Sequence, residues 1–296
     1  MVEPYRMFGV RVARLERLSP TFLRVTFTGD ELGSFADNGY DQRLKLILPL
    51  PEHGLAHLPS GPDWYTRWRA LEDGRRNPLR TYTARLVRRD EREVDVDVVM
   101  HPGGDGPVAR WSRVARPGDA AVLFGADARH PGDHGDVVFD LPPGTGAVLL
   151  AGDETAVPAI CAILERLPED VEGTALLEVP CEQDFLPVET PSRVKVEWLA
   201  RDGAERGALL ESAVRSAAGR LLSPGTAPEA YEDVDVDEEE LWEVPQEECG
   251  EPLYAWLAGE AAVIKALRRH LVGERGMDRR AVAFMGYWRQ GRAEHA

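Results

Sequence analysis

The hydrophobic rhythm of the chain changes once along its length, and this change constrains the fold more than any other feature. From residue 6 to about residue 140, apolar residues recur with period two in short bursts that Gly, Pro and Asp turns separate. Such alternation is typical of the strands of a small antiparallel barrel. The bursts are FGVRVARL, FLRVTFTG, LKLILPL, TYTARLV, VDVDVVM and AAVLFG. We therefore expect a six-stranded barrel.

The second rhythm begins after LPPG at 141–144, where strand-like and helix-like segments alternate. TGAVLLAG, TALLEV, RVKVEWLA, LYAWLAG and AVAFMGYW are typical of strands, whereas TAVPAICAILERLP, GALLESAVRSAAGRLL and EAAVIKALRRHLVGERG are typical of helices. This order predicts a doubly wound parallel sheet, with Pro142 and Pro143 at the domain boundary. The predicted domains are residues 1–142, a β-barrel, and residues 143–296, an α/β unit.

Two segments interrupt these patterns. Residues 51–78 form a long connection in which we predict one short helix at 64–71. Residues 229–251 contain 12 acidic residues and no Lys or Arg, within an insertion at about 223–251. Packing such charges without partners is costly, so we predict a mobile surface insertion. A binding element is the alternative.

Composition excludes several classes of function. The chain has 35 Lys plus Arg against 51 Asp plus Glu, a net charge of −16, which does not suit nucleic-acid binding. No apolar run reaches the length of about 20 residues that spans a bilayer, and the start lacks a signal-like apolar region. We expect a cytoplasmic monomer. The three cysteines are far apart, so we predict no metal centre and expect any redox group to be an organic cofactor.

Four kinds of motif carry candidate chemistry. LRTYTARLV (79–87) holds Arg80, Tyr82 and Thr83 in a strand-like stretch, although strand statistics alone favour an ordinary strand there. HPGGDGPVARWS (101–112) is a glycine-rich loop that leads into a helix start at Pro107, where backbone amides attract phosphate. A plain strand-to-helix turn has a similar sequence.

The predicted parallel sheet adds polar turns at the ends of its strands. LLAGDETAVPAI (149–160) and WLAGEAAVIKAL (256–267) each place acids between a strand and a helix, at the edge where α/β sheets bind ligands. Neither is GxGxxG, and capping of a helix by its own acids explains them equally well. GYWRQGR (286–292) ends the last strand with two aromatics beside arginines, either as a packing plug or as the flank of a planar cofactor.

These motifs, in this order and spacing, resemble the siderophore-interacting protein family of flavin-dependent ferric-siderophore reductases, related to the ferredoxin reductase superfamily. The resemblance covers nearly the whole chain through RTYT, HPGGDGPVARW, LLAGDETAVPAI, YAWLAGEA and GYWRQGR. It implies an N-terminal FAD-binding barrel, a C-terminal NAD(P)H-binding domain and electron delivery to siderophore-bound Fe(III).

The resemblance also implies roles for individual residues. Arg80 would bind the FAD phosphates, Tyr82 would lie along the isoalloxazine ring, and Thr83 would hydrogen-bond near flavin N5. Further residues implied in FAD binding are Val99, His101, Gly106, Pro107, Val108 and Trp111. Those implied on the nicotinamide side are Asp153, Glu154, Thr155, Ala156, Gly259, Glu260, Tyr287, Trp288 and Arg289. Tyr82, Thr83 and Trp288 are the implied catalytic residues, in the sense that they tune the flavin or lie close to the transfer path.

The carboxylates at the predicted parallel-sheet edge bear on the electron donor. Asp153 and Glu154 stand where glycines would welcome a pyrophosphate, which predicts weak NAD(P)H binding or ferredoxin as the donor. The hypothesis from the sequence is therefore a ferric-siderophore reductase that uses FAD and either NAD(P)H or ferredoxin. A general flavin or ferredoxin reductase and a non-enzymatic siderophore-binding protein are the alternatives.

Overall fold

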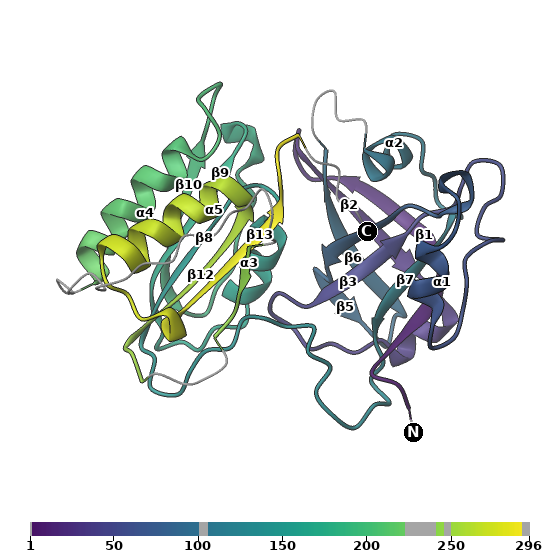
Figure 1. The fold of residues 1–296 in the computed structure, drawn as a ribbon, viewed down its shortest axis with the longest axis horizontal. Helices are drawn as coiled ribbons and strands as arrows, with labels where there is room; N and C mark the ends of the chain where they lie inside the picture. Colours follow the sequence, from purple (N-terminus) through teal and green to yellow (C-terminus); the bar gives the residue numbers. More distant parts are fainter. Residues whose placement is uncertain (1, 101–105, 223–240, 246–249, 292–296) are drawn as a thin grey trace. The chain divides into compact units, whose positions relative to one another are not determined.

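The computed structural model describes residues 2–100, 106–222, 241–245 and 250–291. The chain forms two compact units that divide between Val137 and Val138, just before the Pro142–Pro143 pair (Figure 1). No helix within the described ranges is long and apolar enough to cross a membrane.

The first unit is an antiparallel sheet of seven described strands, in the order β4-β3-β7-β1-β2-β6-β5. The strands are β1 (Tyr5–Arg17), β2 (Phe22–Thr28), β3 (Arg43–Ile47), β4 (Leu79–Thr83), β5 (Leu86–Arg88), β6 (Glu93–Val99) and β7 (Ala120–Ala126). Two helices, α1 (Trp64–Arg69) and α2 (Pro107–Ser112), and the 3-10 turns Asp30–Ser34 and Asp73–Arg75 lie between strands. The short helix predicted within 51–78 is thus present as α1.

The prediction of six barrel strands was wrong by one, because the burst TYTARLV forms two strands. β4 pairs with β3 at one end of the sheet order, whereas β5 pairs with β6 at the other end. Ala84 N donates to Gln42 O at 2.8 Å and Arg85 N donates to Asp95 O at 2.9 Å. Two residues span at most about 7 Å, so the sheet curls until its end strands meet at this link.

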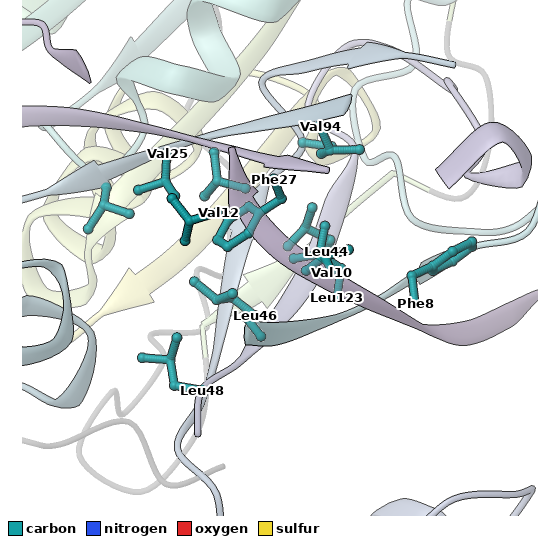
Figure 2. Close-up of a cluster of buried hydrophobic side chains, with 14 of the residues drawn as sticks. Phe8, Val10, Val12, Val25, Phe27, Leu44, Leu46, Leu48, Val94 and Leu123 are labelled. Carbon is teal, nitrogen blue, oxygen red and sulfur yellow. The ribbon is translucent and has the colours of Figure 1, made fainter. Parts of the chain in front are cut away.

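One apolar cluster fills this curled sheet (Figure 2). Alternate residues of each strand supply it, as period-two patterning requires. Its members include Phe8, Val10, Val12, Val25, Phe27, Leu44, Leu46, Leu48, Val94, Val96, Val98 and Leu123. Tyr82 and Trp111 are half-buried and pack against the cluster, so two of the predicted flavin residues border the core.

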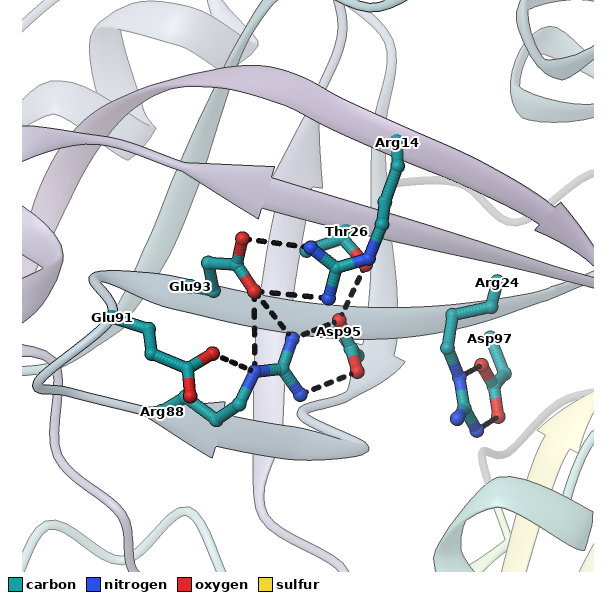
Figure 3. A network of polar contacts seen from close by, with 8 residues as sticks. All are labelled: Arg14, Arg24, Thr26, Arg88, Glu91, Glu93, Asp95 and Asp97. Carbon is teal, nitrogen blue, oxygen red and sulfur yellow. Dashed lines mark hydrogen bonds and ion pairs between the residues drawn. The ribbon is translucent and has the colours of Figure 1, made fainter.

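The intervening residues of β6 carry charge on the opposite face (Figure 3). Arg24 forms a two-pronged ion pair with Asp97, with nitrogen–oxygen distances of 2.7 and 2.8 Å. Arg88 does the same with Asp95, at 2.7 and 2.8 Å. Burial alone would raise the pKa of Asp95, but hydrogen bonds from Arg88 and Thr26 outweigh it and lower the pKa.

The second unit is a sheet of six described strands in the order β10-β9-β8-β12-β13-β11. The strands are β8 (Ala147–Gly152), β9 (Glu172–Val179), β10 (Arg193–Ala200), β11 (Trp242–Glu243), β12 (Leu253–Glu260) and β13 (Val282–Trp288). All neighbouring pairs are parallel except β11 with β13. The apolar sequences of β8 and β12 suit strands that are buried on both faces.

Helices cover both faces of this sheet, which confirms the doubly wound prediction. They are α3 (Val157–Leu164), α4 (Ala208–Leu221) and α5 (Ala261–Arg268), with a π-helical turn at Arg269–Glu274 and 3-10 turns at Glu182–Asp184 and Arg279–Ala281. α4 and α5 lie side by side over one face (Figure 1). The crossover through α3 runs the opposite way along the sheet from those through α4 and α5, so the right-handed rule places α3 on the other face.

The acidic segment is partly built into the sheet, which corrects the prediction that residues 229–251 form a mobile surface insertion. Within the described part of the segment, Leu241 is buried in the core and β11 pairs with β13. Glu243 bonds to Arg268 at 2.9 Å and to Arg279 at 3.0 Å. The cost of burying this charge is offset by partners far along the chain, which the local composition does not reveal. Residues 223–240 and 246–249 lie outside the described ranges.

Candidate cofactor and electron-transfer sites

β4 separates the three predicted flavin residues onto two faces. Side chains alternate along a strand, so Arg80 and Tyr82 share one face and Thr83 lies on the other. Arg80 and Tyr82 are paired in register with Leu46 and Leu44 of the core. Both side chains are partly exposed, whereas Thr83 is buried. One face of β4 therefore carries a cation and an aromatic ring, and the opposite face carries a buried hydroxyl.

Arg80 lies close to its own strand. Its Nη1 donates to Leu79 O at 2.7 Å. A guanidinium offers five N–H donors in a rigid fork that matches phosphate oxygens. The geometry at Arg80 is compatible with a phosphate ligand.

The second flavin motif forms α2, as predicted from Pro107. Gly106 precedes the helix in an extended conformation and makes no side-chain cap. Val108 is buried in the core, and the Trp111 ring stacks on Phe27 with centroids 6.3 Å apart. His101 lies outside the described residues, and Val99 ends β6 in register with Phe22.

One polar group of α2 was missed from the sequence. Ser112 is buried, and its Oγ has no hydrogen-bond partner within the described part of the chain. A buried hydroxyl without a partner is uncommon and indicates a ligand or water. β4 and α2 therefore carry a cation, an aromatic ring and hydroxyls, in Arg80, Tyr82, Thr83 and Ser112, and these side-chain types suit a flavin dinucleotide.

In the second unit, the candidate residues gather at the carboxyl ends of the parallel strands. Asp153 follows β8, Glu260 ends β12 and Trp288 ends β13. Parallel register places these three ends at one edge of the sheet, where α/β proteins bind ligands.

Asp153 connects these elements through its carboxylate. Oδ1 accepts from Thr155 N at 2.8 Å and from Thr155 Oγ1 at 2.5 Å. Oδ2 accepts from Glu260 N and from Trp288 Nε1, each at 2.9 Å. Burial, and then the nearby charge of Glu154, raises the pKa of Asp153 to about 6.

Glycines at this edge make room for the protein's own atoms. Gly259 has φ +151°, and a Cβ there would lie 2.8 Å from Asp153 Oδ2. A Cβ on Gly152 would lie 2.5 Å from Ala156 Cβ and 2.6 Å from Ala258 O. Ala156 itself is buried at the start of α3. The small size of Gly259 and Ala156 therefore allows the turns to pack closely against each other.

Glu154 belongs to a buried ionic cluster that the sequence reading did not include. Its carboxylate bonds to Arg201 at 2.7 and 3.0 Å, and Arg201 also bonds to Glu178 at 3.1 Å. Both Glu side chains are fully buried and Arg201 is 8% exposed. Glu178 is the penultimate residue of β9 and Arg201 follows β10, so a charged residue near the end of a parallel strand was the available sequence signal.

Arg206 links the ionic cluster to Trp288. Its Nη2 lies 3.3 Å from Glu154 Oε1, and its guanidinium carbon lies 4.6 Å from the Trp288 ring centroid. Its Nε is buried and has no hydrogen-bond partner among the described residues. The edge thus combines carboxylates that are paired with arginines and one buried arginine N–H that has no hydrogen-bond partner among the described residues.

The acids at this edge also cap helices. Glu260 accepts from Ala262 N and Val263 N at the start of α5. Glu178 accepts from Gly207 N and Leu210 N at the start of α4. The sequence left open whether these acids cap helices, and at α5 Glu260 does so. Because arginines and helix amides compensate these charges, the carboxylates oppose an anionic ligand less than their number suggests.

The aromatic end of β13 has two environments. Tyr287 stacks on Trp242 at 6.0 Å and meets Trp256 edge-on at 6.2 Å, so it serves as a packing plug. Trp288 instead joins Asp153 and Arg206, and Arg289 beside it is half-buried. Of the predicted residues in this unit, Thr155, Glu260 and Trp288 each bond to Asp153, and Tyr287 packs elsewhere.

Comparison with known proteins places both units in one family. Residues 11–130 match the model of the siderophore-interacting FAD-binding domain, and residues 145–291 match the siderophore-interacting protein model. The chain is 31% identical to an uncharacterized Mycobacterium tuberculosis protein over 294 residues, covering 98% of this chain and 92% of that protein.

Two further relatives have descriptive names. The NADPH-dependent ferric-chelate reductase of Escherichia coli is 27% identical, with 96% of this chain and 93% of that protein covered. The crystal structure of the siderophore-interacting protein SipS from Aeromonas hydrophila matches with a TM-score of 0.70 and 27% identity, over 98% of this chain and 94% of that one. The chain belongs to the siderophore-interacting protein family, and its first unit carries the FAD-binding domain of that family.

Proposed function

We propose that this protein is an oxidoreductase that uses FAD to deliver electrons from NAD(P)H to siderophore-bound Fe(III), with release of Fe(II). The observation that carries the proposal is the presence of a flavin-compatible donor set on β4 and α2, in a chain that matches both family models. The name of the Escherichia coli relative, an NADPH-dependent ferric-chelate reductase, supports the donor and the acceptor.

The residues of the first unit have the following proposed roles. Arg80 binds phosphate oxygens, the Tyr82 ring lies along the flavin, and the Thr83 hydroxyl donates at its reactive edge. Val99, Gly106, Pro107, Val108 and Trp111 shape the remainder of the site, together with His101. FAD, when bound, accepts two electrons as a hydride and releases them singly.

In the second unit, we place the nicotinamide dinucleotide at the edge that holds Asp153 and Trp288. Arg206 supports this assignment, because its side chain is 29% exposed beside Trp288 and its guanidinium can donate to a phosphate or carboxamide oxygen. Thr155, Glu260 and Arg289 complete the edge, and Trp288 lies on the transfer path. No side-chain acid or base is required, because the acceptor step moves only electrons.

Reduction of the metal accounts for its release. Fe(III) is a hard cation that prefers siderophore oxygen ligands much more strongly than Fe(II) does. Each NAD(P)H supplies two electrons and each Fe(III) takes one, so two ferric complexes are reduced per NAD(P)H.

The test is anaerobic spectrophotometry of the purified protein with a ferric siderophore and a coloured Fe(II) chelator. We expect a flavin spectrum that bleaches with NADPH or NADH and two Fe(II) per NAD(P)H consumed. The Ga(III) complex of the same siderophore is the control, because Ga(III) has the charge of Fe(III) and is not reduced.

Other outcomes identify the alternatives. If reduced ferredoxin bleaches the flavin and NAD(P)H does not, ferredoxin is the electron donor. Much faster reduction of free flavin than of any ferric complex would favour a general flavin reductase. A colourless protein that binds the Ga(III) complex would favour a non-enzymatic siderophore-binding protein.

A further inference from the structure

The indole ring of Trp288 is held by two groups from other elements. Its Nε1 donates to Asp153 Oδ2 at 2.9 Å, and the Arg206 guanidinium lies over its face. Asp153 follows β8 and Trp288 ends β13, and β12 lies between these strands. The contact therefore reaches across one strand and ties the last aromatic of the sheet to its first turn.

Asp153 is itself immobilised. Each of its oxygens accepts two hydrogen bonds, and the residue is 3% exposed. The missing side chain of Gly259 leaves the space in which Oδ2 lies. A carboxylate fixed by Thr155 and by the backbone of Glu260 cannot follow the indole if the ring turns, so the direction of Trp288 Nε1 is set by the turn after β8.

We propose that Asp153 is a positioning residue for the reaction, because its carboxylate fixes the orientation of the Trp288 ring. The orientation follows from the contacts in the second unit alone. Its consequence for electron transfer rests on the proposed function, in which Trp288 lies on the donor side.

The charge of Asp153 makes this arrangement sensitive to pH. A proton on Oδ2 occupies a lone pair that now accepts from Glu260 N or Trp288 Nε1. Burial and the charge of Glu154 raise the pKa of Asp153 to about 6. The other charged groups that face this pair are Glu260, which caps α5, and Arg206, which stacks on the indole. Acidification through about pH 6 should therefore release the indole N–H.

Indole ¹H–¹⁵N NMR tests the contact without any reaction. The Trp288 resonance is identified by its loss in Trp288→Phe. We expect it to shift with a midpoint near pH 6 and to lose this titration in Asp153→Asn. Asp278→Asn is the matched control, because Asp278 also accepts a backbone hydrogen bond, from Arg280 N at 2.8 Å, and is not at this edge. The buried indole of Trp256 is the internal reference. A Trp288 chemical shift that changes neither with pH nor in Asp153→Asn would overturn the proposal.

A double-mutant cycle tests the consequence for the reaction. Rapid-mixing rates of flavin reduction are compared for the parent, Asp153→Asn, Trp288→Phe and the double variant. We expect Asp153→Asn to slow reduction at least about fivefold in the parent and less than about twofold when Trp288 is already Phe. Equal effects in both backgrounds would mean that Asp153 acts on the fold alone. If no donor reduces the protein, the proposed function fails while the NMR result still decides the positioning role. The pH titration of the Trp288 resonance in the parent supplies that result if Asp153→Asn does not fold.

Discussion

Glu243 and Arg268 join the described part of the acidic segment to α5. Arg268 Nε donates to Glu243 Oε2 at 2.9 Å, and the Arg268 side chain is only 2% exposed. Glu243 lies on β11, the strand that the acidic composition gave no reason to expect. The pair explains how part of an acidic segment forms the end strand of a sheet, because a buried arginine supplies the charge that the segment lacks.

Removal of this carboxylate should destabilise the second unit. Glu243→Gln keeps the shape and leaves the Arg268 guanidinium with a weaker partner, which should lower the free energy of unfolding by about 1.5 to 3 kcal/mol. Arg279→Ala is the control, because this second partner is 55% exposed and should cost less than about 1 kcal/mol. Urea unfolding measures both, and equal small losses would mean that β11 is not needed.

The flavin assignment predicts a specific effect at β4. Arg80→Ala should weaken FAD binding roughly 10- to 150-fold, because a charged hydrogen bond typically contributes about 1.5 to 3 kcal/mol. Lys45→Ala is the matched control, because Lys45 is a neighbouring cation paired in register with the exposed Thr81 on the other face. Flavin retention after dilution and gel filtration measures the difference, and equal retention in both variants contradicts the assignment.

The buried cluster in the second unit predicts unequal roles for its two arginines. Arg201→Met leaves the fully buried Glu154 and Glu178 without their shared cation and should cost about 3 to 5 kcal/mol. Arg206→Met should cost about 1 kcal/mol, because that side chain is 29% exposed and lies farther from Glu154. Urea unfolding compares the two, and similar costs would show that the two arginines share the charge equally.

At Gly259, the cost of a steric clash with Asp153 can be measured separately from the cost of the positive φ angle. Gly259→Ala places a methyl 2.8 Å from Asp153 Oδ2 at φ +151°, whereas Gly203→Ala is strained at φ +92° but meets nothing within 4 Å. We expect about 1 to 2 kcal/mol for Gly203→Ala and at least about 1 kcal/mol more for Gly259→Ala. Thermal unfolding gives both values. Equal costs would mean that the Asp153 side chain moves away from the added methyl at little cost.

The ionic network of the barrel predicts a dependence of stability on pH. The folded-state pKa of Asp95 is lowered, so its stabilisation is fully present above the ordinary Asp pKa of about 3.9 and is lost as pH falls through the folded value. Asp95→Asn should therefore lower the urea midpoint at pH 7 and flatten its decline in acid. Asp30→Asn is the control, because the Asp30 side chain is 98% exposed in its pair with Arg92. A parent-like acid profile in Asp95→Asn contradicts the prediction.

The sequence by itself determined the two units and most of their elements. Period-two bursts predicted the barrel strands, strand and helix alternation predicted the parallel sheet, and Pro107 marked the start of α2. These signals are local, because alternation and turn residues act over a few positions. The ordered motifs likewise identified the family.

The tertiary structure decided which residues meet. TYTARLV divides into β4 and β5 because its two halves find different partner strands at opposite ends of the sheet order. Asp153 bonds to Trp288, 135 residues away, and Glu154 bonds to Arg201, 47 residues away. From the sequence, the acids of the second unit are expected to repel an anionic ligand. In the structure, arginines and helix amides compensate their charges. Burial and the identity of a counter-charge depend on segments that are distant in the chain, so a local reading of the sequence cannot supply them.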